Sequence, residues 1–349
     1  MLFARHLKPP CMHQPDHFLH GIQRLALRAT LHEANRIESW HDWFPITLDE
    51  HHLIWRHIPQ RFTTPFFADL LSQQSPTHRQ VCLTPLDHLP HLPATPAPAA
   101  FIFHTSRCGS TLLTQMLATL PQCIAISEAP IIDVCLRASP ATMRADQQLA
   151  LLRYVILALG QRRQQESACI IKLDCWHLPY LPMLRAAFPD TPCWFLYREP
   201  QAVLASHQRQ RGPQMVPGMI FPQQLPTAGT PLAAGDLDGY CIQVLALLFQ
   251  SALGQCSAHP ATLHLLNYQQ LPHAVWQQFL PQLGIHPEPD QLAALQARAG
   301  FHAKQQGTPF AGDASSTLSA ASTDLLQSLV LPQYQKLEQQ RICACNALL

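Results

Sequence analysis

Residues 101–349 predict an α/β domain, a parallel β-sheet with helices on both faces, and residues 1–83 predict an N-terminal extension to it. The main observation is that short apolar runs of strand length alternate with segments of helical periodicity. A second is the stretch 84–100, whose five prolines exclude regular structure and predict a stiff connector. A third is size, because about 250 residues suffice for one sizeable domain.

The first predicted strand is Phe101–Phe103, and apolar residues from Leu112 to Leu120 follow it at helical spacing. A later helix is predicted to begin at Pro200, because proline suits the first position of a helix. Residues 212–235 contain several Pro and Gly and predict a long irregular insertion, a candidate lid. In chain order the other predicted elements are strand Cys123–Ile126, a helix from Leu152 to Leu159, strand Cys169–Leu173, a helix from Leu181 to Phe188, strand Cys193–Tyr197, a helix from Leu237 to about Leu253, strand Thr262–Leu266 and a helix from Pro272 to Leu283.

The composition excludes several classes of protein. Only 13% of the 349 residues are charged, with 23 Lys and Arg against 22 Asp and Glu, so the chain is neither disordered nor a non-specific nucleic-acid binder. No apolar run reaches the roughly 18 residues of a membrane span, and residues 1–10 do not resemble a signal peptide, which predicts a cytoplasmic protein. The 12 Cys and 20 His are scattered, which predicts buried free thiols and no metal site. Since 19 of the 23 cations are Arg, the positions of the four Lys are informative.

A phosphate-binding loop is predicted at residues 104–111, between the first strand and its helix, where backbone N–H groups and the positive helix end can hold a phosphate. Nucleoside triphosphatases carry G-x-x-x-x-G-K-[ST] at such a place. Gly109 and Thr111 fit that pattern, but His104 replaces the first Gly and Ser110 replaces the Lys. The missing Lys argues against ATP or GTP hydrolysis, although Arg107 can supply charge from within the loop. A P-loop nucleotide-dependent phosphotransferase or triphosphatase, and a non-catalytic nucleotide-binding module, stay as alternatives.

The same loop resembles that of the sulfotransferases that use 3′-phosphoadenosine-5′-phosphosulfate (PAPS). Their donor loop is similar to P-[KR]-[SC]-G-[ST]-[ST], and residues 106–111 match it apart from Ser for Pro. The resemblance implies a P-loop fold and a loop that wraps the 5′-phosphosulfate of the donor. The residues implied in that contact are Arg107, Cys108, Gly109, Ser110 and Thr111.

A second stretch, residues 194–206, is similar to the family's other donor signature, an apolar strand followed by R-D-P and a later Ser. Arg198 and Ser206 stand eight residues apart, as in the family, where these positions hold the 3′-phosphate. Glu199 replaces the usual Asp. A guanidinium fork at a strand end and a hydroxyl two turns into the next helix can converge on one phosphate.

Two further stretches extend the resemblance over residues 100–284. Residues 169–174 resemble the strand that carries the active-site Lys, and residues 263–271 resemble the Y-E-x-L segment, with Gln269 where an acid is common. A Lys inside an apolar strand is costly unless its ammonium reaches a site or a partner. Lys172 is therefore assigned, with Arg107, to the phosphosulfate oxygens as a catalytic residue. Lys304 lies in a loop-like stretch where the family often completes its donor site.

Glu128 is the leading candidate for the base that takes the acceptor proton. It follows a predicted strand and so lies at the carboxyl edge, where open α/β sheets bind ligands. Several sulfotransferases resemble this layout, with a Glu about as far beyond the donor loop, although a helix-capping role is a competing interpretation. Asp174 stands where cytosolic members carry the His of K-x-H, and His177 is a further alternative base. Arg209 and Arg211 are additional candidates for contact with the 3′-phosphate or an anionic acceptor.

The resemblance implies an enzyme that moves a sulfuryl group from PAPS to an acceptor hydroxyl or amine by in-line displacement, without a required metal. The expected acceptor is a small molecule, a carbohydrate or a peptide, because the fold fixes the donor while variable loops choose the acceptor. Three roles stay open for residues 1–83: covering the acceptor site, forming a homodimer, or an unrelated activity.

Overall fold

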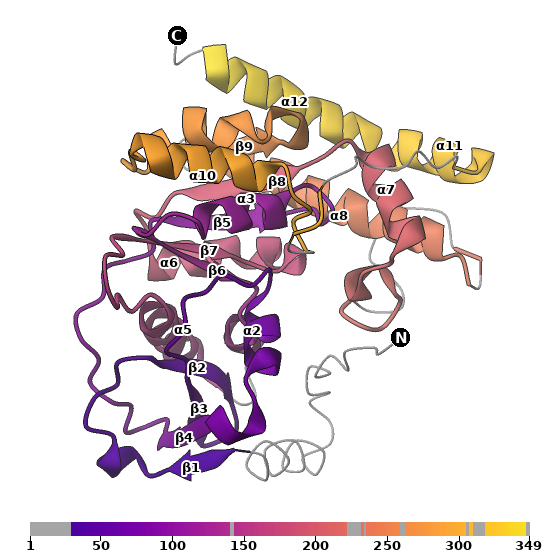
Figure 1. Ribbon diagram of the computed structural model, residues 1–349. Coiled ribbons are helices and arrows are strands. Elements are labelled where there is room, and N and C mark those ends of the chain that lie inside the picture. The colour runs from indigo at the N-terminus through magenta and orange to yellow at the C-terminus, as the bar shows by residue number, and fades with distance from the viewer. Residues whose placement is uncertain are drawn as a thin grey trace.

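The structure, a computed structural model, describes residues 29–139, 143–221, 232–233, 235–258, 263–304, 307–309 and 318–346. It contains a five-stranded sheet and a separate four-stranded sheet, with helix α5 (Ala145–Leu159) between them (Figure 1). Residues 222–231 and 234 of the candidate lid, 212–235, fall outside the described residues, as does the predicted strand start at Thr262.

The central sheet is parallel throughout, in the order β6-β7-β5-β8-β9. Its first strand in the sequence, β5, lies in the middle, and the chain adds strands on both sides of it. Sheets of this kind bind ligands outside the carboxyl ends of the strands, beside the strand at which the strand order reverses. The predicted strands are confirmed to within about one residue at each described end. The observed bounds are β5 (Ala100–His104), β6 (Cys123–Ser127), β7 (Ala168–Lys172), β8 (Cys193–Tyr197) and β9 (Leu263–Asn267).

Side chains of the central strands alternate between two core clusters, as a period of two requires. In β5, Phe101 and Phe103 belong to the larger cluster, which also contains residues of α5, whereas Ala100 and Ile102 belong to the smaller one. Both faces of the sheet are buried under helices, and this confirms the predicted fold class.

Helix α3 (Ser110–Leu117) begins directly after the β5 strand and its loop, and α7 (Pro200–Arg209) begins at Pro200, as predicted. The carboxylate of Glu199 accepts hydrogen bonds from the N–H groups of Gln201 and Ala202, so this Glu caps α7. The other α-helices are α2 (Phe67–Gln73), α4 (Pro130–Leu136), α6 (Leu181–Ala187), α8 (Leu237–Ala258), α9 (Leu280–Gln282), α10 (Pro289–Ala299), α11 (Ala320–Leu329) and α12 (Leu331–Asn346).

Within the described residues, α8 alone is long and apolar enough to cross a membrane by length and composition. Tyr240, Val244 and Phe249 of this helix pack inside the larger core cluster of the protein.

The N-terminal extension forms the four-stranded sheet, in the order β1-β4-β3-β2. Its aromatic side chains Trp43, Phe44 and Trp55 are buried in the same cluster as α5, so the extension and the central sheet share one core. Residues 86–99 cross between the two sheets without helix or strand. The strand bounds are β1 (Thr30–His32), β2 (Trp43–Leu48), β3 (His52–His57) and β4 (Gln80–Pro85).

Candidate active site

The loop between β5 and α3 has an unusual backbone. Ser106, Arg107 and Gly109 have φ values of 68°, 52° and 83°, in the left-handed region that residues other than glycine seldom adopt. The ring Nδ1 of His104 accepts a hydrogen bond from the N–H of Ser106 at 2.9 Å. Strained backbone of this kind clusters at functional sites. The loop lies at the carboxyl edge of the sheet, between the end of β5 and the positive end of α3.

Gly109 lies against the segment that follows β9. A Cβ at this position would come within 2.7 Å of Leu271 Cδ1 and 2.9 Å of Tyr268 Cδ2, so a larger residue would displace the loop. The ring of Tyr268 also stacks on the guanidinium of Arg198, at 4.3 Å. Nη1 of Arg198 lies 3.5 Å from the carbonyl oxygen of Arg107. Tyr268 thus joins the two predicted donor motifs.

Lys172, Glu128 and Thr111 meet at the carboxyl edge of the sheet. Lys172 ends β7 and is fully buried. Its Nζ lies 2.9 Å from Oε1 of Glu128 and donates to Oγ1 of Thr111 at 3.3 Å. Glu128 follows β6, where Ser127 pairs with Lys172 across the parallel ladder, so strand register brings the two charges together.

Glu128 is held in its ionised form. Burial by itself would raise the pKa of this carboxyl group, but the positive charge of Lys172 and the hydrogen bond with His104 outweigh burial and hold the pKa well below its usual value. The backbone of Glu128 has φ 54°, and its side chain is 22% exposed. It is therefore a carboxylate that a substrate can reach.

Asp174 behaves in the opposite way. Its side chain is buried, and burial together with the negative charges of Glu128 and Asp133 raises its pKa well above the usual value. The two pKa values are thus shifted in opposite directions, as expected when two carboxyl groups share one small volume, and Asp174 is the one that keeps its proton to higher pH. A protonated carboxyl group is not a base.

Both ring nitrogens of His177 have hydrogen-bond partners. Nδ1 accepts the N–H of Asp174 at 3.3 Å, and Nε2 lies 2.8 Å from Oδ1 of Asp133. Burial lowers the pKa of this imidazole despite the neighbouring carboxylate. Of the three candidate bases, Glu128 alone combines an ionised state with partial exposure.

Positive charges gather around this carboxylate. Lys304 carries an ammonium whose pKa is lowered to about 8 by burial and by repulsion from Arg107 and Lys172. Arg107 donates from Nη2 to the carbonyl of Gln210. Repulsion among three cations in one place is relieved by an anion, so this group fits a polyanionic ligand.

Two further predicted donor residues, Cys108 and Ser206, differ in their surroundings. Cys108 is fully buried, and although burial raises the pKa of a thiol, hydrogen bonding to His104 lowers it here. Ser206 lies in α7, half-buried and two turns beyond its first residue. The neighbouring His207 is buried, and burial and the positive charge of Arg107 lower its pKa to about 3.

The two further arginine candidates lie at the end of α7. Arg211 pairs with Asp238 of α8 at 2.6 Å and donates to the carbonyl of Leu237 at 2.8 Å, so its guanidinium is engaged by α8. Arg209 is exposed in the last turn of α7.

Sequence reasoning missed three residues of this site. His104 was interpreted only as a departure from the triphosphatase pattern, yet its ring contacts the loop and Glu128. Tyr268 was noted only as part of a motif. Phe66 stands in the short run Pro65–Phe67 of the N-terminal extension, which matches no donor motif, and its ring lies 4.7 Å from Nζ of Lys172. The aromatic run was a signal, but only the fold shows where it lies.

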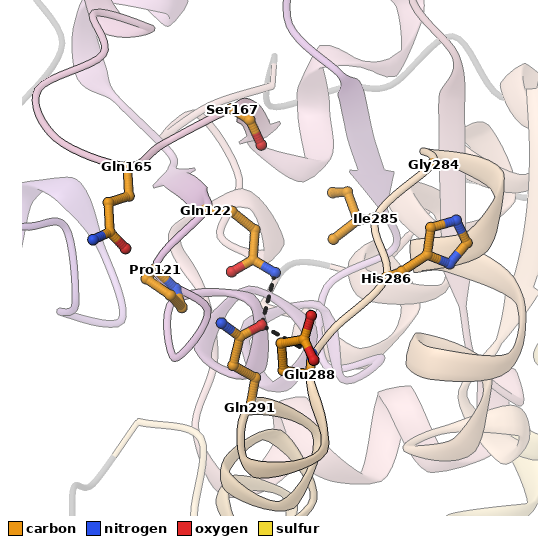
Figure 2. A pocket seen from close by; sticks show the side chains of 9 residues that line it. All are labelled: Pro121, Gln122, Gln165, Ser167, Gly284, Ile285, His286, Glu288 and Gln291. Atoms are coloured by element: carbon orange, nitrogen blue, oxygen red, sulfur yellow. Dashed lines mark hydrogen bonds between the residues drawn. The ribbon is translucent and has the colours of Figure 1, made fainter.

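A separate pocket of about 400 Å³ opens at the amino edge of the sheet. Figure 2 shows that amide side chains point into it, with Gln122 bonded to Gln291. No predicted site residue lines this pocket. In the part of the chain that the structure describes, no group of three His, Cys, Asp or Glu is placed to bind a metal.

No family model and no curated protein matches the sequence. The structure is similar to a sulfotransferase from Alicyclobacillus acidocaldarius, with 13% identity, a TM-score of 0.40, and coverage of 70% of this chain and 96% of the other. It is also similar to a sulfotransferase from Mycobacterium tuberculosis, with 12% identity, a TM-score of 0.36, and coverage of 60% of this chain and 75% of the other. A sulfotransferase from Mycobacterium avium matches with 11% identity, a TM-score of 0.37, and coverage of 59% of this chain and 68% of the other. All three are sulfotransferases, the family that the motifs at residues 106–111 and 194–206 resemble.

Proposed function

We propose that this protein is a sulfotransferase that uses PAPS as the sulfuryl donor. One observation supports this above the others: chemistry-bearing residues from separate stretches converge at the carboxyl edge of the sheet. Lys172 contacts both Glu128 and Thr111, and Arg198 reaches the carbonyl of Arg107.

The donor set suits a nucleotide with two anionic ends. Arg107, Lys172 and Lys304 supply positive charge beside the loop, together with the first-turn N–H groups of α3. Arg198 and Ser206 follow the next strand and would hold the 3′-phosphate. PAPS supplies the sulfuryl group when bound, and 3′-phosphoadenosine 5′-phosphate is what remains after transfer.

Glu128 takes the proton of the acceptor hydroxyl in this proposal. As the acceptor oxygen bonds to sulfur, the bond between sulfur and the phosphate oxygen breaks, and its electron pair stays with the phosphate. The proton moves to the Glu128 carboxylate, which Lys172 keeps ionised beforehand. Lys172 and Arg107 then stabilise the negative charge that grows on the phosphate side. The acceptor, which a screen with radiolabelled donor would identify, is proposed to be a small molecule, carbohydrate or peptide.

The test is calorimetric titration with 3′-phosphoadenosine 5′-phosphate. The protein should bind it at micromolar concentration, and Arg198→Ala should weaken binding about 10- to 100-fold, because a charge-assisted contact is lost. Arg36→Ala is the matched control, since Arg36 is an exposed arginine of the N-terminal extension. Absence of binding at tens of micromolar, or magnesium-dependent binding of ATP in its place, would contradict the proposal.

A further inference from the structure

Phe66 of the N-terminal extension lies inside the candidate active site. The centre of its ring is 4.7 Å from Nζ of Lys172 and 5.4 Å from Nζ of Lys304. An ammonium within about 6 Å of a ring face is attracted by the negative potential of that face. One ring therefore serves two lysines, half of the four in the whole chain.

The segment that carries Phe66 is fixed on both sides. The carbonyl of Thr63 accepts a hydrogen bond from Nε2 of Gln115 at 3.1 Å, and Nη2 of Arg61 donates to the carbonyl of Leu120 at 2.9 Å. These bonds join the segment to α3 and to the residues just after it. On the other side, Phe67 is buried and its ring stacks on Phe62 at 5.6 Å. The ring of Phe66, half-buried, is thus placed by the packing of two parts of the protein.

The contacts of Lys172 give the ring a definite task. An ammonium group has three N–H bonds to satisfy, and a fully buried one cannot use water. Glu128 and Thr111 accept two of them, and Nζ also lies over the ring of Phe66, 4.7 Å from its centre. Lys304 would be repelled by Lys172, and repulsion already contributes to its lowered pKa. A ring close to both ammonium groups attracts each of them and so offsets part of this repulsion.

We propose that Phe66 is a positioning residue of the active site, and that its ring holds the ammonium groups of Lys172 and Lys304 at the 5′ end of the donor site. The N-terminal extension is then a working part of that site. This inference rests on the proposed function, because it concerns how the same cations meet the donor. The competing interpretation is that Phe66 only fills space between the extension and α3.

The decisive experiment compares two nucleotides on two variants by calorimetry. 3′-Phosphoadenosine 5′-phosphate has both phosphates, whereas adenosine 3′-phosphate lacks the 5′ end. Phe66→Leu keeps an apolar side chain but removes the ring, and it should weaken the first nucleotide about three- to tenfold while leaving the second unchanged. Phe66→Trp keeps an aromatic face and should bind both nucleotides within about twofold of the unmodified protein. Leu31→Ala, at an exposed apolar residue of the same extension, is the control and should change neither affinity.

A subtler replacement covers the case in which Phe66→Leu does not fold. Mono-, di- and trifluorophenylalanine at position 66 keep the shape of the ring but withdraw increasing negative potential from its face, so affinity for 3′-phosphoadenosine 5′-phosphate should fall with each added fluorine. Equal losses for both nucleotides, or no loss in Phe66→Leu and the fluorinated protein, would overturn the inference. Absence of binding by the unmodified protein would instead overturn the proposed function, so the two failures are distinguishable.

Discussion

The two edges of the central sheet differ in charge more than in shape. At the carboxyl edge, Lys172 and Glu128 form a charged pair at 2.9 Å, with further cations close by. The amino edge has a pocket of about 400 Å³ in which Glu288 is the one acidic lining residue, and the amides of Gln122 and Gln291 bond to each other there at 3.0 Å (Figure 2). In a chain of which only 13% is charged, this concentration of charge is the reason the proposed site is placed at the carboxyl edge and not in the pocket.

Burial makes this difference meaningful. A buried charge costs several kcal/mol before its partner compensates, so a fold keeps one only where the pair has a structural or chemical use. Lys172 is fully buried, and near it the pKa of Glu128 is held well below its usual value while that of Asp174 is raised well above it. Such opposed titration behaviour in one small volume is typical of catalytic sites.

The largest difference between the two edges is expected in turnover, when one carboxylate at each edge is replaced. Glu128→Gln keeps the shape of the side chain but removes the base, so turnover of labelled donor should fall by about 10²- to 10⁴-fold while nucleotide affinity stays nearly unchanged. Glu288→Gln is the matched control at the amino edge, where Glu288 lines the pocket, and its turnover should equal that of the unmodified protein. Full turnover in Glu128→Gln would remove this carboxylate from the chemistry.

Replacing Glu128 and replacing Lys172 should lower the free energy of unfolding by different amounts. Glu128→Gln leaves a fully buried ammonium without its counter-charge, which should lower the free energy of unfolding by about 1–3 kcal/mol. Lys172→Met should cost less, because an apolar side chain of similar length fills the space and the remaining carboxylate is 22% exposed. Urea denaturation of both variants measures the two losses, and a larger loss for Lys172→Met would show that the carboxylate is the costlier of the two to leave unpaired.

The sequence predicts the carboxyl edge better than the rest of the site. Alternation of apolar strands with helices predicts the sheet, and parallel register then brings Glu128 beside Lys172, since Lys172 ends β7 and Glu128 directly follows the neighbouring strand β6. Phe66 could not be predicted, because its contact with Lys172 depends on how two sheets share one core, and no local pattern records that. The raised pKa of Asp174 could not be predicted either, because it follows from burial and from charges contributed by other segments.

The titration of Lys304, a lysine of the carboxyl edge, should determine how nucleotide affinity depends on pH. The pKa of Lys304 in the free protein is about 8. Below that pH the ammonium of Lys304 is charged and attracts the 5′-phosphate. Above that pH the side chain is neutral in the free protein and must take up a proton when the nucleotide binds. The affinity should therefore fall as pH rises through about 8, by at most tenfold per pH unit for one proton. Lys304→Met should flatten this part of the profile, and Lys336→Met, at an exposed lysine of α12, should leave it intact.

The smallest effect is expected at the amino edge, and it should appear in stability alone. Gln291→Ala removes the acceptor for Nε2 of Gln122 at 3.0 Å and for the N–H of Glu288 at 3.1 Å. Loss of a helix-capping bond and a side-chain bond should lower the free energy of unfolding by about 0.5–1.5 kcal/mol. Affinity for 3′-phosphoadenosine 5′-phosphate should stay within about twofold, because no charge at the carboxyl edge changes. A marked loss of nucleotide affinity in Gln291→Ala would mean that the two edges are coupled through the sheet, and that charge alone does not define the site.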